Sequence, residues 1–419
     1  METKRVVVTG IGAITPIGNS VPEMWQAMKE GKSGVGPITL FDATNFKTQF
    51  AAEVKDFDIT TIMDRKEARK LDRYAQLAIA AAKEAMEHSR LNMQEEDADR
   101  IGVIWGTGMG GLTTLLGEHV DFVQGDGTPR FGPFYIPKSI PNMGSAHISL
   151  LYGLKGLNYS VSAACASSGN AIAAALDAIR LGRADVIVTG GSEACITTGG
   201  VGGFNALRAL STRNDSPETA CRPYSKSRDG FIIGEGAGCL ILEEYEHAVR
   251  RGATILAELA GAATNADAYH MTAPEPTGQG AARVMQLALQ DAGLRPEDID
   301  YINTHGTSTP LGDVAELTAI KQVWGEDAYR LSISSTKSMT GHLLGGTGAV
   351  EAIASIMALR DGVVPPTINH EEGDEDENID YKLNLTFNQA QKREMRAAMS
   401  NNFGFGGHNA CLIVKKVEK

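Results

Sequence analysis

Cys165 lies where a strand-like run gives way to an alanine-rich helical segment, in the sequence SVSAACASSGN at residues 160–170. A thiol at the N-terminus of a helix faces unpaired backbone N–H groups and the positive end of the helix dipole, and both favour the nucleophilic thiolate. The small neighbours leave room for an incoming carbonyl group. Taken alone, a free cysteine is more often buried and inert. That interpretation is given to the other four cysteines, Cys195, Cys221, Cys239 and Cys411.

Two histidines stand next to glycine at the start of small-residue loops. His305 lies in NTHGTSTP, and His342 lies in SSTKSMTGHLLG, which also contains Lys337. A lone histidine of this kind is usually a satisfied core or turn residue. Two of them together with a helix-terminal cysteine predict a nucleophilic site in which imidazoles assist the thiol.

A loop with the sequence SNNFGFGGHN precedes the last predicted strand, at residues 400–409. Its glycines allow a sharp bend between two phenylalanines. Its backbone N–H groups are candidates to complete an oxyanion hole. The alternative is a structural turn that packs aromatic side chains into the core.

The segment GTGMGG at residues 106–111 matches the GxGxxG dinucleotide pattern, follows a predicted strand, and has Asp126 twenty residues after its first glycine. A single match is weak in a chain with 47 glycines, and Met109 stands where a pyrophosphate would pass. No Walker A motif, metal-ligand cluster or GxSxG elbow accompanies it. We therefore expect neither a nucleotide nor a metal ion.

Short apolar runs alternate with helical patterns along the chain, which predicts an α/β fold. Several strands lack a polar face, so both faces of the sheets should be covered. Strands are predicted at residues 5–12, 101–105, 185–189, 238–242, 299–303 and 410–415, and helices at 66–88, 168–181 and 279–291. Residues 159–181 and 331–359 both run from a strand through a small-residue turn into an alanine-rich helix. This predicts two related halves that meet near Ala253.

Composition narrows the class of protein. The 419 residues suggest more than one domain, and the net charge of −12 gives no reason to expect nucleic acid. Five widely spaced cysteines without a CxxC pair favour a reducing compartment. The N-terminus is predicted to be a strand, not a signal peptide, and charges interrupt every candidate membrane span. We expect a cytoplasmic protein, with the acidic run at residues 370–378 forming a solvated loop.

The four chemistry-bearing segments together resemble the β-ketoacyl-acyl carrier protein synthases of the thiolase superfamily. The resemblance runs from RVVVTGIGAITPIG to NNFGFGGHNACLIVKK, and includes GVGGFNALRALSTRND, CRPYSKSRDGFIIGEGAG and DAYHMTAPEP. Ser338 and Leu343, on either side of His342, are more similar to type II than to type I synthases. The resemblance implies a homodimer with a thiolase-like, five-layered αβαβα fold made of two similar halves. These are residues 1–252 with Cys165, and residues 253–419 with His305, His342 and the GFGG loop.

Carried over by position, the resemblance implies that Cys165 accepts the acyl group. His305 and His342 would assist decarboxylation, and Lys337 and Glu351 would support them. The backbone N–H groups of Cys165 and Phe405 would form the oxyanion hole, with Phe405 also acting as a gate. The implied substrate-binding residues are Met109 and Phe204 in the acyl pocket, Thr307 and Thr309 near the malonyl group, Thr272 in a mobile loop at residues 267–274, and Glu351 and Phe403.

The implied activity is that of a type II β-ketoacyl-[acyl-carrier-protein] synthase. It is a decarboxylative Claisen condensation of malonyl-carrier with a cysteine-bound acyl chain in fatty-acid elongation. No cofactor is implied, because phosphopantetheine arrives on the carrier. The carrier is acidic, so we expect a basic docking patch. Residues 65, 69 and 73 are spaced to lie on one face of a predicted helix, and this face would form the patch. The alternative is that the charged face is only solvated. The candidate docking residues are Arg65, Lys66, Arg69, Lys70, Arg73, Arg130 and Arg208.

Rival functions stay open within the same fold. Two histidines argue against a thiolase or a CoA-primed synthase, whose patterns are Cys-His-Cys and Cys-His-Asn. An intact cysteine motif argues against a non-catalytic chain-length subunit. The chain departs from the family pattern at His408, Ala166 and Phe131, where relatives have Thr, Thr and Lys. None of the three touches the chemistry, although Phe131 would weaken carrier docking slightly.

Overall fold

The apolar runs of the sequence form the strands of one large mixed sheet. The protein is described here from a computed structural model, which covers residues 4–417. The N-terminal strands are β1 (Val6–Ile14), β4 (Ile101–Gly106), β5 (Asn158–Val161), β6 (Val186–Glu193) and β7 (Gly236–Glu244). The C-terminal strands are β8 (Ala257–Ala266), β9 (Tyr301–Asn303), β10 (Ser332–Ser334), β13 (Ala397–Gly404) and β14 (His408–Lys415). Short pairs are formed by β2 (Gly36–Pro37) with β3 (Phe50–Ala51), and by β11 (Val363–Val364) with β12 (Gln391–Lys392). All six predicted strands are present.

Strand order repeats between the two halves of the sheet. The order is β10-β9-β13-β14-β8-β1-β7-β6-β4-β5. When the five large strands of each half are numbered by their order along the chain, both halves have the same order, 3-2-4-5-1, from the outer edge of the sheet to its middle. The halves join through β1 and β8, which pair antiparallel. This repeat confirms the expectation of two similar halves. The predicted boundary at residue 253 falls between α9 (Tyr245–Arg250) and β8, and a division into two domains there stays a prediction.

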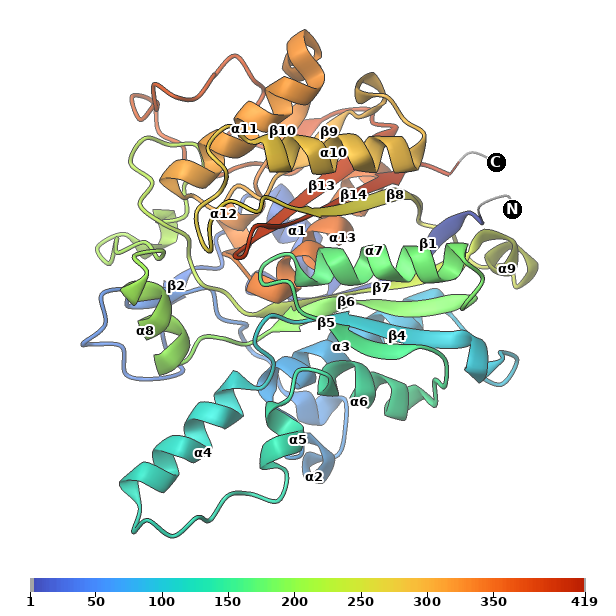
Figure 1. Cartoon of the computed structure of the whole chain (residues 1–419), viewed down its shortest axis with the longest axis vertical. Helices are drawn as coiled ribbons and strands as arrows, with labels where there is room; N and C mark the ends of the chain where they lie inside the picture. The colour runs from blue at the N-terminus through green and yellow to red at the C-terminus, as the bar shows by residue number, and fades with distance from the viewer. Residues whose placement is uncertain (1–3, 418–419) are drawn as a thin grey trace.

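Helices form three layers around the strands (Figure 1). α3 (Arg73–Ser89) and α6 (Met143–Tyr152) cover the N-terminal strands, and α10 (Gln279–Ala292) with α11 (Pro310–Trp324) cover the C-terminal strands. α7 (Ser167–Arg180) and α13 (Thr347–Asp361) lie between the two sets of strands. The remaining α-helices are α1 (Val21–Lys29), α2 (Arg65–Ala68), α4 (Leu112–Gln124), α5 (Tyr135–Ser139), α8 (Thr198–Ala206) and α12 (Lys337–Thr340). The five-layered αβαβα arrangement is confirmed.

The central helix α13 has almost no polar face because it is enclosed by strands from both halves. Small residues make this close packing possible. A Cβ atom on Gly348 would lie 2.3 Å from Oδ1 of Asn402, and one on Gly238 of β7 would lie 2.7 Å from the backbone N of Val350. Any larger residue at these glycines would push the layers apart.

Two local predictions need correction. The predicted helix at residues 66–88 is in fact two helices, α2 and α3, with Asp72 as the N-cap of α3. Its carboxylate accepts hydrogen bonds from the N–H groups of Tyr74 and Thr114, so the chain turns there. The acidic run at residues 370–378 is a loop, but it is anchored to buried arginines and is not merely solvated. Across residues 4–417, no helix is long and apolar enough to cross a membrane.

Candidate active site

Cys165 lies in the turn between β5 and α7, two residues before the first residue of the helix. The preceding Ala164 has a φ of +49°, a left-handed conformation that few residues adopt and that marks a strained turn. Ser167 holds this turn, because its hydroxyl accepts a bond from the N–H of Ala163 and donates one to the carbonyl of Ala164. Cys165 is the one cysteine of the five that is not fully buried. The predicted strand–cysteine–helix arrangement is present.

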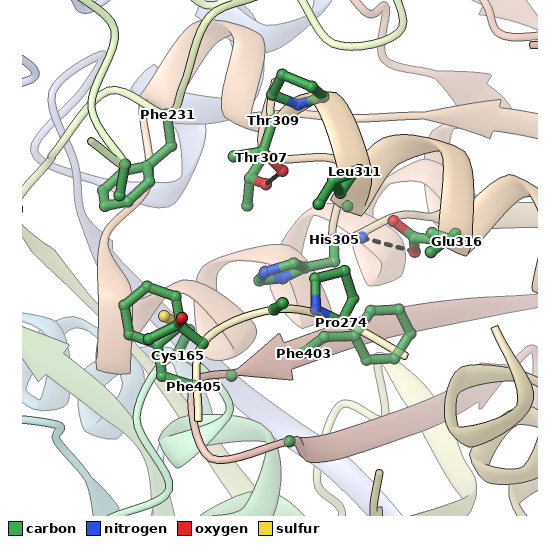
Figure 2. Close-up of a pocket in the computed structure, with 18 of the residues that line it drawn as sticks. Cys165, Phe231, Pro274, His305, Thr307, Thr309, Leu311, Glu316, Phe403 and Phe405 are labelled. Carbon is green, nitrogen blue, oxygen red and sulfur yellow. Dashed lines mark hydrogen bonds between the residues drawn. The ribbon is translucent and has the colours of Figure 1, made fainter. Parts of the chain in front are cut away.

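A cavity of about 530 Å³ opens at Cys165. Figure 2 shows Cys165 and Phe405 on one side of His305 and the threonine pair on the other. The cavity brings together most of the expected substrate contacts. The predicted residues that line it are Cys165, Phe204, Arg208, Thr272, His305, Thr307, Thr309, His342, Phe403 and Phe405.

Three predicted residues do not reach this cavity. Met109 is 53% exposed on the surface, so its role in an acyl pocket stays a prediction. Lys337 and Glu351 are fully enclosed beneath the site. Glu351 was expected both to support the histidines and to bind substrate, and its burial is compatible only with the first role.

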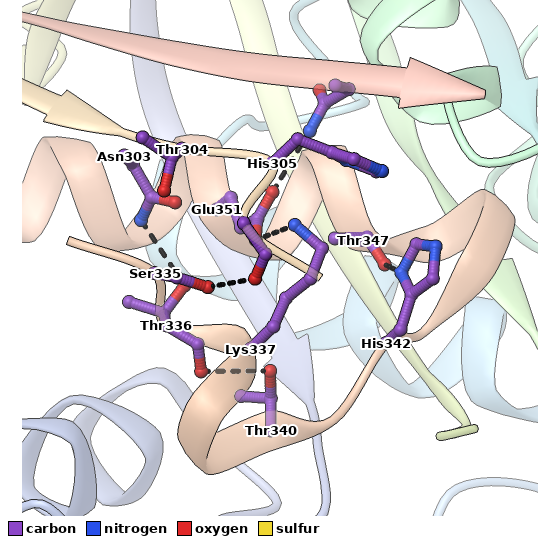
Figure 3. Close-up of polar contacts among 12 residues, drawn as sticks. Asn303, Thr304, His305, Ser335, Thr336, Lys337, Thr340, His342, Thr347 and Glu351 are labelled. Atoms are coloured by element: carbon purple, nitrogen blue, oxygen red, sulfur yellow. Dashed lines mark hydrogen bonds and ion pairs between the residues drawn. The ribbon is translucent and has the colours of Figure 1, made fainter. Parts of the chain in front are cut away.

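The two histidines face each other edge to face, with ring centroids 5.3 Å apart. His305 follows β9, and its Nδ1 is buried without a hydrogen-bond partner. His342 follows α12, and its Nδ1 lies 3.0 Å from Oγ1 of Thr347 (Figure 3). Burial and the charge of Lys337 lower the pKa of both imidazoles well below the usual 6.5. Both rings are therefore neutral at pH 7, and each has one N–H group to donate.

Burial raises the pKa of the Cys165 thiol to about 12. The nearby charge of Lys337 and the backbone N–H groups of Phe405 and Cys165 act in the opposite direction but do not outweigh it. The backbone N–H groups at the helix N-terminus do favour the thiolate, as expected, but desolvation is the larger effect. If this sulfur is the nucleophile, its proton must leave as it attacks.

A buried ion pair lies beneath the histidines. Nζ of Lys337 donates to Oε1 of Glu351 at 2.6 Å, and both side chains are essentially inaccessible (Figure 3). Asn402 donates to the second carboxylate oxygen. Removing either partner would leave an uncompensated buried charge. The carboxylate of Glu351 thus holds the ammonium group of Lys337 in place below the cavity floor.

The GFGG loop forms the other side of the surroundings of Cys165. A Cβ atom on Gly404 would lie 2.8 Å from the carbonyl of Ala163 and 3.0 Å from the backbone N of Cys165. Only glycine fits this close approach. It allows the N–H groups of Phe405 and Cys165 to lie near the same sulfur, as an oxyanion hole requires.

The segment at residues 267–274 packs against the GFGG loop. The N–H of Gly406 donates to the carbonyl of Met271 at 2.7 Å, and the N–H of Asp267 donates to the carbonyl of Gly407 at 2.9 Å. Thr272 from this segment lines the cavity. The predicted position of the segment is correct, and its mobility stays a prediction.

Glu316 is a site residue that the sequence did not reveal. It lines the cavity from α11, and its two oxygens accept hydrogen bonds from the backbone N–H groups of His305 and Gly306 at 2.8 Å (Figure 2). Asn401 donates a third. Burial raises the pKa of Glu316 to about 7. A carboxylate therefore orients the backbone of His305 from eleven residues away along the chain.

Glu193 explains the GxGxxG match. Its carboxylate accepts hydrogen bonds from the backbone N–H groups of Gly108 and Met109 and from the hydroxyl of Thr107. The N–H of Gly345, near His342, donates to the same carboxylate. The anion held by this glycine-rich loop is thus an internal side chain, which occupies the groups that would bind a phosphate. Among residues 4–417, no cluster of side chains suits a metal ion.

The candidate docking residues form separate groups. Arg65, Lys66 and Arg69 are exposed on and just after α2, whereas Arg208 follows α8 at the cavity mouth. Arg73 instead pairs with the buried Glu235 at 2.6 Å. The predicted face formed by residues 65, 69 and 73 is therefore wrong, because the helix is interrupted between Arg69 and Arg73. Arg130 is 72% exposed and pairs with Asp126, and Lys70 pairs with Glu67.

Comparisons with known proteins agree along the whole chain. Residues 3–248 match the family model described as "Beta-ketoacyl synthase, N-terminal domain", and residues 256–371 match its C-terminal domain. A 3-oxoacyl-[acyl-carrier-protein] synthase 2 of Coxiella burnetii is 48% identical over 417 residues, which cover both chains completely.

Solved structures show the same likeness. A beta-ketoacyl synthase from Burkholderia phymatum is 37% identical and superimposes with a TM-score of 0.91, covering 99% of this chain and all of that one. A ketosynthase solved in complex with its type II PKS acyl-carrier protein is 34% identical with a TM-score of 0.89, and the match covers both chains completely.

Proposed function

The chain belongs to the beta-ketoacyl synthase family and catalyses carrier-protein-dependent condensation in fatty-acid elongation, and we propose that Cys165, His305 and His342 carry out the reaction. One observation carries this assignment. A partly exposed thiol, two neutral imidazoles and two backbone N–H donors meet in one cavity. Each group has a role in acyl transfer followed by decarboxylation.

In the first half-reaction, the sulfur of Cys165 attacks an acyl thioester on the carrier. The tetrahedral oxyanion accepts hydrogen bonds from the N–H groups of Cys165 and Phe405, an arrangement worth about 3–4 kcal/mol per donor when preorganised. The carbon–sulfur bond to the carrier breaks, and the carrier leaves as a thiol. It takes up a proton equivalent to the one lost by Cys165.

In the second half-reaction, malonyl-carrier occupies the cavity and loses CO₂. The enolate oxygen that develops accepts hydrogen bonds from His305 and His342, so charge is stabilised where it forms. The enolate carbon attacks the Cys165 thioester, and 3-oxoacyl-carrier, two carbons longer, is released. The departing sulfur takes up one proton, in keeping with its raised pKa. Decarboxylation drives the step, so the proposal includes no cofactor of the chain's own.

The rival enzymes of this fold use a different set of side chains. The facing pair of His305 and His342 favours the Cys-His-His chemistry over that of a thiolase or a CoA-primed synthase. The cavity at Cys165 argues against a non-catalytic chain-length subunit.

Carrier docking is the next part of the proposal. The exposed cations Arg65, Lys66 and Arg69, on and just after α2, would receive an acidic carrier, and Arg208 would receive the arm at the cavity mouth. Arg69→Glu should raise the KM for acyl-carrier several-fold at low salt and leave kcat nearly unchanged. Arg250→Glu, which makes the same charge reversal at an exposed position on α9, is the control. An unchanged KM for Arg69→Glu would remove α2 from the docking surface.

A homodimer is also proposed. Exposed apolar side chains gather on α4, α5, α6 and the edge strand β5, which lie together in Figure 1. They are Leu115, Val120, Phe122, Val123, Phe134, Ile136, Ile140, Leu150, Leu151 and Tyr159. Such a surface beside an unpaired strand edge fits a second copy of the chain.

The proposal also includes a cytoplasmic location, which the five unpaired cysteines support.

The decisive experiment is intact-protein mass spectrometry after incubation with a medium-chain acyl-carrier, for the native chain and Cys165→Ala. A single acyl adduct on the native chain alone is the expected result. An adduct from acyl-CoA but not from acyl-carrier would favour the CoA-primed reaction. No adduct from either donor would favour the non-catalytic subunit.

A further inference from the structure

The turn that carries Thr307 and Thr309 is held in a strained conformation. The two hydroxyls lie 3.0 Å apart and both line the cavity. Between them, Ser308 has a φ of +66°, which is unfavourable for a residue with a side chain. Such a conformation persists only where surrounding groups determine it. The groups that do so therefore control where the two hydroxyls point.

Most of the restraint comes from one segment, residues 222–230. The N–H of Arg222 donates to Oγ of Ser308 at 3.0 Å, and the N–H of Gly230 donates to its carbonyl at 3.1 Å. The N–H of Ser308 donates to the buried Asp313 at 3.1 Å. All three polar groups of Ser308 are thus bonded. None of the residues that make these bonds lies among the expected catalytic residues.

The side-chain part of this restraint is Arg228, whose side chain is 2% exposed. Nε donates to the carbonyl of Thr309 at 3.1 Å, and Nη2 donates to that of Pro310 at 2.8 Å. Nη1 pairs with Asp376 at 2.8 Å. The planar fork of a guanidinium can fix two neighbouring carbonyls in this way, whereas an ammonium group cannot do so at both.

We infer that Arg228 is a positioning residue for the malonyl half-reaction, because its guanidinium fixes the Thr307–Thr309 turn through the carbonyls of Thr309 and Pro310. This inference rests on the proposed function, in which that turn faces the malonyl group. The acyl-transfer step uses Cys165 and the GFGG loop and does not depend on the turn. Loss of the fork should therefore affect one half-reaction selectively.

Arg222 provides a matched control. Its side chain is 4% exposed, and it pairs with Asp374 and Glu371 of the acidic loop to which Asp376 also belongs. Its side chain makes no hydrogen bond to Thr309 or Pro310, and its bond to Ser308 comes from the backbone. Arg222→Lys and Arg228→Lys therefore perturb equally buried arginines attached to the same loop, and only the second disturbs the turn directly.

The experiment compares the native chain with both lysine variants in two assays. Acylation of Cys165 is followed by mass spectrometry, and kcat and KM are measured with malonyl-carrier as the varied substrate. Arg228→Lys should acylate at nearly the native rate and lose about 10- to 100-fold in kcat/KM for malonyl-carrier. Arg222→Lys should stay within about threefold of the native chain in both assays.

Three results would overturn the inference: native condensation by Arg228→Lys, equal losses in the two variants, or equal losses in both half-reactions. If Arg228→Lys does not fold, the inference is tested with Asp376→Asn. This substitution removes the charge of the half-buried carboxylate that pairs with Arg228, so it loosens the guanidinium without replacing it. A KM for malonyl-carrier raised at least threefold, with native acylation, supports the inference, and an unchanged KM overturns it. Failure of the native chain to form 3-oxoacyl-carrier would refute the proposed function itself.

Discussion

Replacing Glu316 by glutamine isolates the effect of one buried carboxylate on the folded state. The side chain is 2% exposed, and its oxygens accept hydrogen bonds from the backbone N–H groups of His305 and Gly306 and from Asn401. Glutamine has nearly the same shape but does not titrate. Any difference in how the two proteins respond to pH therefore comes from this carboxyl group.

The sign and size of the effect follow from the raised pKa. The folded protein holds the Glu316 proton with a pKa of about 7, whereas the ordinary value is 4.5. Stability from this group is therefore fully present below pH 4.5 and is lost as the pH rises through 7. At about 1.4 kcal/mol per pKa unit, the loss between pH 5.5 and pH 8 is about 2 kcal/mol. The glutamine variant should not show it.

Urea denaturation followed by circular dichroism measures this difference at the two pH values. The free energy of unfolding of the native chain relative to Glu316→Gln should fall by about 2 kcal/mol between pH 5.5 and pH 8. The free energy of unfolding of Glu95→Gln, a substitution at an exposed position, should match that of the native chain at both pH values. A gap between the native chain and Glu316→Gln that is the same at pH 5.5 and pH 8 would refute the argument that burial keeps this carboxyl group protonated.

Other groups give shorter tests. Because the pKa of Cys165 is about 12, its alkylation by iodoacetamide should accelerate about tenfold per pH unit up to pH 9, and a plateau near pH 7 would contradict this. Lys337→Met should destabilise the fold by roughly 3–5 kcal/mol in urea denaturation, and adding Glu351→Gln should recover most of the loss. No recovery would mean that the pair is not the cause. Gly404→Ala should slow acyl-adduct formation, measured by mass spectrometry, at least about tenfold, since its Cβ would crowd the backbone of Cys165. An unchanged rate would mean that the GFGG loop does not set the oxyanion hole.

Much of the scaffold could be predicted because its signals are local. Strands covered on both faces must be continuously apolar, so β1, β4, β6, β7 and β14 were visible as short hydrophobic runs. The turn containing Cys165 was likewise visible, because a strand-like run before it and an alanine-rich helical pattern after it leave only a short connection between them. The break before α3 also had a local signal, because Asp72 precedes a helical pattern as an N-cap does.

The supporting carboxylates could not be predicted, because their partners are far away along the chain. Glu193 binds a loop more than eighty residues before it and the N–H of Gly345 beyond it. The protonation state of Cys165 could not be predicted for the same reason. The helix terminus is local and visible in sequence, but the burial that outweighs it comes from segments far away along the chain, which include Ile196, Phe231 and Leu344.

The repeated strand order has a consequence for how two different reactive groups came to share one cavity. Cys165 and His342 each lie between the third strand and the central helix of their own half, so they occupy corresponding places in a pseudo-twofold arrangement. A dimer of identical halves would have to present the same residue at both places. A single continuous chain is free of that symmetry and can put sulfur on one side of the axis and imidazole on the other.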